Sequence, residues 1–143
     1  MPVLRRKKTK MILPEENSFS DQIKIIVKNL YYISESDSEI FPFIGEKCES
    51  VSGDELLRQL KRNDPVEERD FEDFFKRLTE MQEWFGDEET TTANKFLELK
   101  ELLLKNLKDM KIFKVGKIQV EIYIVGLNSE SVLAGVWTKA VET

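Results

Sequence analysis

The sequence predicts a mixed α/β domain in which helices cover both faces of a mainly antiparallel sheet, a three-layer α/β/α sandwich. Three observations favour this architecture. Amphipathic helical segments fill most of the first two thirds of the 143 residues, and strand-like segments fill the last third. One of those strands is apolar on both faces, which is typical of a central strand buried between two layers. Hydrophobic residues make up 41% of the chain, enough for a packed core.

The first two helices are predicted from apolar spacing and from capping residues. Between residues 21 and 33, apolar side chains recur every three or four positions, and Ser18 or Ser20 can cap the start. Ser52 and Glu55 have the spacing of a capping box ahead of a second, short helix. The apolar faces of the two helices comprise Ile23, Ile26, Val27 and Leu30, and Leu56, Leu57 and Leu60, respectively.

Two further helices follow by the same reasoning. Asp70 can cap a helix with an aromatic face, and a longer helix is predicted from about residue 92 to residue 108. Their apolar faces comprise Phe71, Phe74, Phe75 and Leu78, and Phe96, Leu99, Leu103, Leu107 and Met110, respectively. Each face repeats every three or four residues, so both helices should pack one side against the sheet.

The strands are predicted from alternation and turn residues. Residues 34–39 contain no apolar side chain and should form an exposed loop, followed by a short strand at 40–44 in which Pro42 favours an edge position. The remaining predicted strands are 112–115 and 118–125, which flank a hairpin turn at Gly116-Lys117, and the doubly apolar 132–141.

Composition excludes several classes of function. The chain has no histidine, which removes Ser-His and Cys-His nucleophiles and the commonest transition-metal ligand. The single Cys48 excludes an internal disulfide and any cysteine cluster. No apolar run is long enough to cross a bilayer, and the start lacks a secretory signal, so we expect a cytoplasmic protein that does not bind membranes. Residues 1–17 should form a mobile basic tail ahead of a domain at 18–143. This tail could be a plain solvated end, a nuclear localisation signal or a contact for a polyanion.

The charge is distributed unevenly. The net charge is −5, but residues 34–91 alone carry 18 acidic and seven basic side chains. Such a surface repels a phosphate backbone, which argues against direct nucleic-acid binding and favours a basic partner. The alternative is that these acids simply solvate helix faces.

Three features could carry function, each with a plainer alternative. The acidic loop at 34–39 offers oxygen ligands to a hard cation but lacks the glycine and closing glutamate of a calcium loop. Gln82 and Trp84 could anchor a partner, or Trp84 could fold back over Phe74. The ending Glu142-Thr143 follows a buried strand and could present oxygens at a fixed point, or it could be a frayed end.

An ordered set of segments resembles the nuclease A inhibitor family, whose members block sugar-nonspecific DNA/RNA endonucleases. The order and spacing agree from about residue 20 to the end, most closely from residue 70, whereas residues 40–66 diverge. The matching segments are Ser34-Glu35-Ser36, Phe74-Phe75, Gln82-Glu83-Trp84 with Asp87, Glu88 and Glu89, Lys105-Asn106-Leu107-Lys108, residues 120–126, Leu133-Ala134-Gly135 and residues 138–143.

The resemblance implies a PR-1-like α/β/α sandwich and a non-enzymatic, acidic inhibitor, monomeric when free. It implies that Glu35 matches the family's essential glutamate at the metal site and that Thr143 matches the terminal threonine that ligates the metal. Gln82 and Trp84 match two further interface residues. The protein would need no cofactor of its own, because the basic partner nuclease supplies the Mg²⁺ at the interface.

Two other functions stay open at this point. The same acidic face could bind another basic partner without inhibiting a nuclease. Glu35 and Asp37 could also act as the acid and base of a hydrolase, although an exposed polar loop does not provide the buried environment that such a pair needs.

Overall fold

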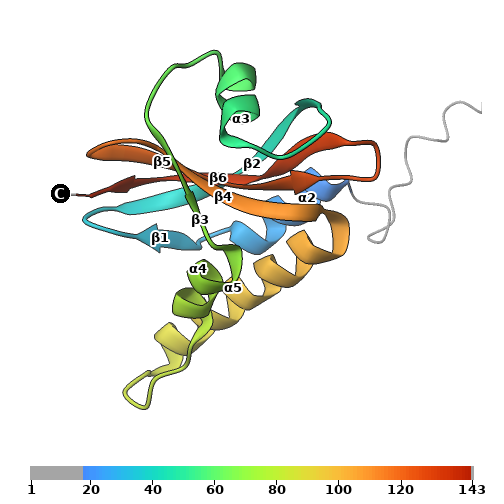
Figure 1. The fold of residues 1–143 in the computed structure, drawn as a ribbon. Helices are drawn as coiled ribbons and strands as arrows, with labels where there is room; N and C mark the ends of the chain where they lie inside the picture. Colours follow the sequence, from blue (N-terminus) through green and yellow to red (C-terminus); the bar gives the residue numbers. More distant parts are fainter. Residues whose placement is uncertain (1–17, 143) are drawn as a thin grey trace, which may run out of the picture.

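An antiparallel sheet of six strands forms the centre of the molecule (Figure 1). The computed structural model describes residues 18–142, and the strand order is β1-β2-β6-β5-β4-β3. The strands are β1 (Tyr31–Ile33), β2 (Asp37–Lys47), β3 (Val66–Arg69), β4 (Lys108–Gly116), β5 (Gln119–Leu127) and β6 (Val132–Val141). The described residues form four helices, α2 (Phe19–Val27), α3 (Gly53–Leu60), α4 (Phe71–Thr79) and α5 (Asp87–Asn106). The predicted mixed class with a mainly antiparallel sheet is confirmed.

Helices α2, α4 and α5 cover one face of the sheet, with α5 packed against both of the others (Figure 1). The predicted apolar faces supply this core, which is the larger of two clusters. From α5 come Phe96, Leu99 and Leu103, all at most 4% exposed. Each such buried side chain contributes about 1.5–3 kcal/mol, so this layer is a main source of hydrophobic stabilisation.

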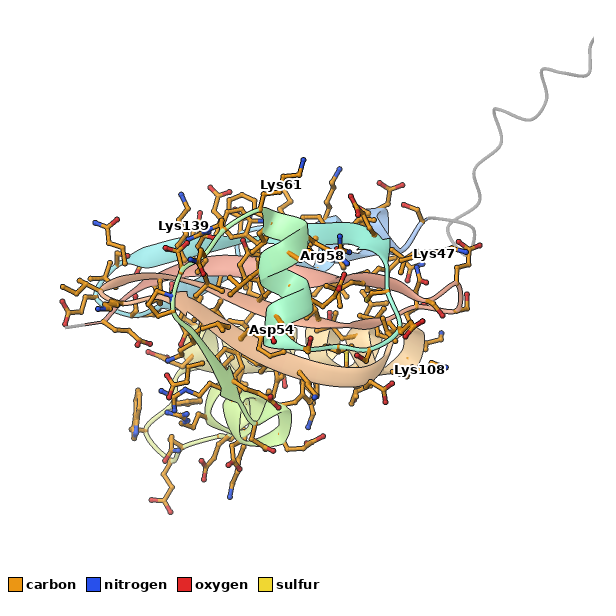
Figure 2. All side chains as sticks on the ribbon, turned by 45° about the horizontal axis from the view of Figure 1, so that its top comes forward. Lys47, Asp54, Arg58, Lys61, Lys108 and Lys139 are labelled. Carbon is orange, nitrogen blue, oxygen red and sulfur yellow. The ribbon has the colours of Figure 1, made fainter. Side chains whose placement is uncertain are left out.

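The opposite face of the sheet is covered by the short helix α3. Figure 2 looks onto this face and shows α3 lying across the strands, with Asp54 near its start and Lys61 at its end. Leu56 of α3 is fully buried against sheet residues such as Phe113 and Val125. Helices therefore lie on both faces of the sheet, whereas the likeness to PR-1 proteins in particular stays a prediction.

Strand β6 is central, as its two apolar faces predicted. It lies between β2 and β5, and Leu133 and Val136 are buried in the two different clusters. Gly135 has a φ of +157°, and a Cβ at this position would lie only 1.9 Å from the carbonyl oxygen of Ile124 on β5. The close pairing of the two central strands therefore requires glycine here.

The first predicted helix is too long, which is a correction. It begins after Ser18, whose hydroxyl accepts from the Asp21 amide at 3.1 Å, but it ends at Val27 instead of residue 33. Asn29 then adopts a positive φ of 61°, and residues 31–33 form β1. The helical spacing continued to Leu30, which is buried, but pairing with β2 outweighs it for the aromatic and β-branched residues that follow.

Other boundaries also differ from prediction. Strand β2 begins at Asp37, so the predicted loop shortens to residues 34–36. Strand β3 was not predicted, because its sequence is almost entirely charged. Helix α5 begins at Asp87 instead of residue 92, since the Glu89 carboxylate accepts from the Gly86 amide at 3.0 Å.

Pro42 was predicted to lie at an edge of the sheet, and among the described residues it lacks a neighbouring strand on one side. Strand β2 pairs with β6 at this residue, but its other neighbour β1 pairs only with residues 37–39. In the described part of the chain, Pro42 therefore faces no strand on that side, where its missing N–H costs nothing. None of the helices in residues 18–142 is both long and apolar enough to span a bilayer.

Candidate functional site

One serine side chain fixes the turn between β1 and β2 to the end of β6. The hydroxyl of Ser34 accepts a hydrogen bond of 3.1 Å from the Val141 amide, although the two residues lie 107 positions apart. The same hydroxyl donates to the Ser36 carbonyl at 3.3 Å and accepts from the Ser36 amide at 3.4 Å. These bonds span Glu35, so the backbone that carries this exposed carboxylate is held beside the last strand.

A second side chain strengthens the same junction. Thr138 of β6 is only 2% exposed, and its hydroxyl donates to the Glu39 carbonyl at 2.7 Å. Thr138 and Ile40 form the last paired position between β6 and β2 at this end. Beyond that point, the threonine and serine hydroxyls supply the hydrogen bonds that a continued strand pair would have made.

The end of β6 is also held from its other side. The amide of Glu142 donates to the Ile118 carbonyl at 2.8 Å, and its carboxylate forms an ion pair with Lys114 of β4. The Lys114 side chain is only 14% exposed and the Glu142 side chain 39%, so the lysine of this pair is shielded from water. Glu142 is therefore ordered, and the alternative of a frayed end does not apply up to this residue. Thr143, the predicted metal ligand, lies outside the described residues.

Tyr32 connects this region to α4. Its ring stacks on Phe74, with 5.7 Å between the ring centroids and 10° between the planes. Burial raises the pKa of the Tyr32 hydroxyl, and the negative charge of Glu142 raises it further, against the opposing charges of Arg77 and Arg69. The phenol therefore stays neutral at physiological pH, and Glu142 lies within electrostatic reach of the α4 side of the sheet.

Gln82 and Trp84 lie on the loop between α4 and α5. Both are exposed, and Trp84 retains 72% of its accessible surface. Its indole contacts the neighbouring Phe85, with ring centroids 4.8 Å apart, whereas Phe74 stacks on Tyr32 instead. The alternative in which Trp84 folds back over Phe74 is therefore wrong, because Trp84 is largely exposed and Phe74 packs against Tyr32 and Phe75.

The structure brings two of the predicted site segments together and leaves the third separate. The Glu35 turn and the end of β6 meet at one end of the sheet, on the left in Figure 1, and the loop with Gln82 and Trp84 projects below the same end. All the described site residues are thus exposed on protruding segments, which suits contact with a large partner more than enclosure of a small ligand.

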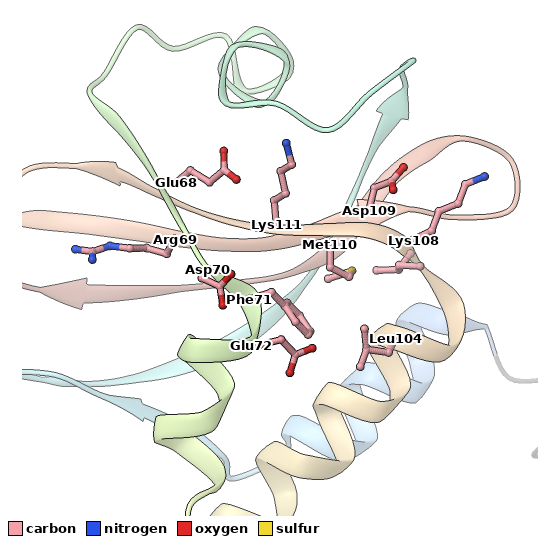
Figure 3. Close-up of a pocket in the computed structure, with 11 residues that line it drawn as sticks. Glu68, Arg69, Asp70, Phe71, Glu72, Leu104, Lys108, Asp109, Met110 and Lys111 are labelled. Atoms are coloured by element: carbon pink, nitrogen blue, oxygen red, sulfur yellow. The ribbon is translucent and has the colours of Figure 1, made fainter.

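A surface hollow elsewhere does not involve these residues. It has a volume of about 410 Å³ and lies between the start of α4, the end of α5 and β4 (Figure 3). Its lining includes both acidic and basic side chains, among them Asp70, Glu72, Lys108 and Lys111. Within residues 18–142, no three His, Cys, Asp or Glu side chains are grouped to hold a metal ion.

Sequence reasoning missed the residues that organise the site. Ser34 stood out only as a member of a polar loop and of the matching segment Ser34-Glu35-Ser36, and nothing in the local sequence distinguishes Lys114 from the chain's other lysines. Their importance depends on the register between β6, β5 and β4, which brings Val141 and Glu142 to these positions. Only the serine next to a candidate glutamate gave a usable signal.

Comparison with known families supports the resemblance. Residues 17–143 match the family described as nuclease A inhibitor-like protein, which covers nearly the whole chain. No curated protein matches the chain significantly.

Proposed function

Because the chain belongs to the nuclease A inhibitor-like family, we propose that it binds and inhibits a sugar-nonspecific, magnesium-dependent DNA/RNA endonuclease. The observation that carries this proposal is the hydrogen bond between Ser34 and Val141, which sets the Glu35 turn against the end of β6. The two segments that would contact the nuclease's metal, the Glu35 turn and the end of β6, are thus held side by side. The inhibitor itself would have no catalytic role.

The oxygen donors of this chain suit the magnesium ion that the proposed partner would carry. Mg²⁺ prefers oxygen ligands, and Glu35 offers a carboxylate on an exposed turn. We place the ion in the nuclease, with Glu35 and Thr143 supplying oxygens toward it. Occupying the place of substrate phosphate oxygens in this way would block hydrolysis without any reaction on the inhibitor.

Gln82 and Trp84 would add contacts at the edge of the same interface. Exposed tryptophan is among the residues that contribute most to protein–protein affinity, because burying its large ring removes much apolar surface from water. In the proposed complex the 72% exposed surface of Trp84 becomes buried. The Gln82 amide can then both donate and accept hydrogen bonds at the rim.

The first experiment is an inhibition assay against a panel of magnesium-dependent nonspecific nucleases, comparing the parent with Glu35→Gln. We expect Glu35→Gln to inhibit at least about tenfold less well, since hydrogen bonds to charged groups contribute ~1.5–3 kcal/mol. The stability of the variant should change by less than about 0.5 kcal/mol, because Glu35 is exposed.

Asp37→Asn is the matched control, since Asp37 is an exposed carboxylate two residues further along and should tolerate the change. If Glu35→Gln inhibits like the parent, Glu35 does not belong to the binding site. If the parent binds a nuclease without inhibiting it, the acidic face is a non-inhibitory interaction surface. A hydrolase is disfavoured, because both Glu35 and Asp37 are exposed to solvent.

A further inference from the structure

We propose that Ser34 and Lys114 are positioning residues, which lock the Glu35 turn and the end of β6 into one binding unit before any partner arrives. This inference rests on the proposed function, because the locked unit is the part that would meet the nuclease. Neither residue needs to touch the partner, since each acts through a neighbour.

The case for Ser34 comes from the strand register. The pairing of β2 with β6 stops at Ile40 and Thr138, yet β6 continues to Val141. On the side of β6 that faces β2, the Val141 amide donates its hydrogen bond to the Ser34 hydroxyl instead. The same oxygen also bonds both backbone groups of Ser36. This hydroxyl therefore adds to the backbone hydrogen bond of 2.9 Å from the Ser34 amide to the Ser36 carbonyl, and it attaches the turn to β6.

The case for Lys114 comes from the opposite side of β6. Lys114 lies on β4, which is separated from β6 by β5. Its ammonium group forms an ion pair with the Glu142 carboxylate at the end of β6. The Glu142 amide is bonded to Ile118 at the β4–β5 turn, so backbone and side chain of Glu142 are both held. The side chains of Lys114 and Glu142 are 14% and 39% exposed, so screening by salt is limited mainly at the lysine.

Ordering the unit in advance should strengthen binding. A flexible turn and a frayed strand end would each lose conformational freedom on contact with the nuclease, which weakens affinity. A locked unit loses that freedom on folding instead. The effect should appear mainly as slower dissociation, because affinity differences among variants of one interface lie mostly in that rate.

Ser34→Ala tests the first lock, with Ser34→Thr as the conservative rescue. Ser129→Ala is the control, because Ser129 is an exposed serine in the β5–β6 turn, outside the proposed binding unit. Ser34→Ala should weaken inhibition about three- to tenfold, mainly through faster dissociation, whereas Ser34→Thr and Ser129→Ala stay near the parent. In the free chain, hydrogen exchange at the Val141 amide should accelerate in Ser34→Ala and remain slow in the other two.

Lys114→Met tests the second lock, and Lys114→Arg keeps the charge. Lys105→Met, at the exposed end of α5, is the control for losing one positive charge. We expect Lys114→Met to weaken inhibition by a similar factor and to accelerate exchange at the Glu142 amide. Lys114→Arg should restore both properties, and Lys105→Met should leave both unchanged. Circular dichroism melts establish that each variant is folded.

The two readouts separate the two proposals. If the parent inhibits no nuclease in the panel, the proposed function is wrong, and amide exchange alone decides whether the two residues lock the unit. If Ser34→Ala exchanges the Val141 amide faster but inhibits like the parent, the positioning role is overturned while the inhibitory function stands. Unchanged exchange at both amides in Ser34→Ala and Lys114→Met overturns the lock itself.

Discussion

At the scale of single residues, the proposed site depends on short polar groups held by the backbone around them. Glu35 lies in a three-residue turn that is closed by hydrogen bonds from both the hydroxyl and the backbone amide of Ser34. Trp84 differs, because this residue is 72% exposed on a loop, and among the ring pairs of the described residues its ring contacts only that of its neighbour Phe85. The binding role of a side chain therefore depends on the backbone that holds it as well as on its own chemistry.

The sharpest prediction at this scale concerns Thr143. In the 143-residue chain, deleting Thr143 removes its hydroxyl and sets the terminal carboxylate back by up to ~3.6 Å, more than a magnesium–oxygen bond of about 2.0–2.1 Å. Thr143→Ala removes only the hydroxyl, and an added C-terminal tag displaces only the carboxylate. We expect all three to inhibit less well in the nuclease assay while melting at the parent temperature.

Comparison of the three variants assigns the contribution of each oxygen. If only Thr143→Ala retains inhibition, the carboxylate is the essential group; if only the tagged chain retains it, the hydroxyl is. Parent-like inhibition by all three would show that Thr143 takes no part, and the family's mode of metal contact would not apply here.

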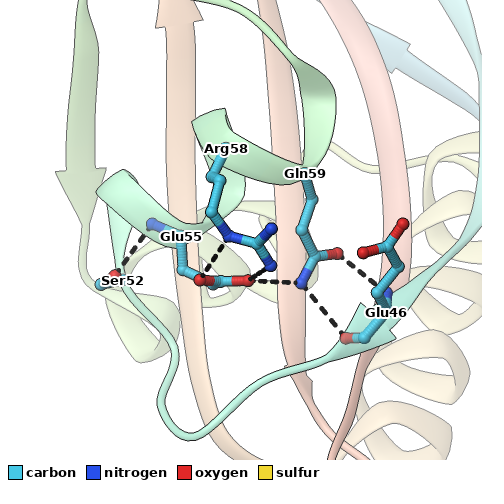
Figure 4. Close-up of polar contacts among 5 residues, drawn as sticks. All are labelled: Glu46, Ser52, Glu55, Arg58 and Gln59. Atoms are coloured by element: carbon cyan, nitrogen blue, oxygen red, sulfur yellow. Dashed lines mark hydrogen bonds and ion pairs between the residues drawn. The ribbon is translucent and has the colours of Figure 1, made fainter.

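At the scale of elements, α3 shows how one short helix is attached to an irregular strand. The pairing of β2 with β6 shifts between Ile44 and Lys47, which leaves Glu46 outside the regular ladder. The Gln59 side-chain amide then replaces a strand: its oxygen accepts from the Glu46 amide at 2.9 Å, and its nitrogen donates to the Glu46 carbonyl at 3.2 Å (Figure 4). Gly45 permits this approach, because a Cβ there would lie 2.3 Å from the Gln59 oxygen.

Glu55 orients this amide and predicts a pH dependence. Hydrogen bonds from Arg58 and then Gln59 lower the pKa of the Glu55 carboxyl. A carboxyl whose pKa is lower in the folded state adds stability above its unfolded pKa, and this stability is lost as the pH falls through the folded value. The free-energy difference between the parent and Glu55→Gln should therefore be largest near neutral pH and shrink below about pH 4.

Urea unfolding at several pH values measures this difference. Glu130→Gln is the control, since Glu130 is an exposed acid in the β5–β6 turn and lies far from α3 in the sequence. A Glu55→Gln difference that stays constant from neutral to acidic pH would show that the Arg58 and Gln59 bonds do not favour the charged form.

At the scale of the whole molecule, the acidic middle of the chain should attract a basic partner before the two proteins touch. Residues 34–91 include the Glu35 turn and the Trp84 loop, and they carry 18 acidic against seven basic side chains. A nuclease that binds polyanions presents a basic cleft, so attraction over distance can raise the association rate about 10- to 1000-fold.

The corresponding prediction is that association with an inhibited nuclease slows steeply as salt increases. Mobile ions screen exposed charges beyond ~8 Å at physiological ionic strength, whereas short contacts within the complex are screened less. Stopped-flow measurements should therefore show a large fall in the association rate and a smaller change in the dissociation rate. An association rate that is flat between low and high salt would exclude steering by the acidic surface.

The sequence by itself determined the local features of this protein. The caps at Ser18, Ser52 and Asp70 and the apolar faces behind them depend on residues within one or two helical turns, so the pattern is sufficient. The two apolar faces of β6 likewise indicated a central strand. The candidate residues Glu35 and Trp84 came from their chemistry and from the resemblance, and the structure establishes that both are exposed.

Tertiary structure alone decided the features that depend on distant partners. Residues 31–33 leave the predicted helix because β2 offers them hydrogen bonds, and the charged β3 forms only because β4 lies beside it. The Ser34 hydroxyl reaches Val141 across 107 residues because the sheet register aligns the β1–β2 turn with the end of β6. Such contacts depend on how strands are ordered and aligned, and neither periodicity nor spacing in the chain encodes that alignment locally.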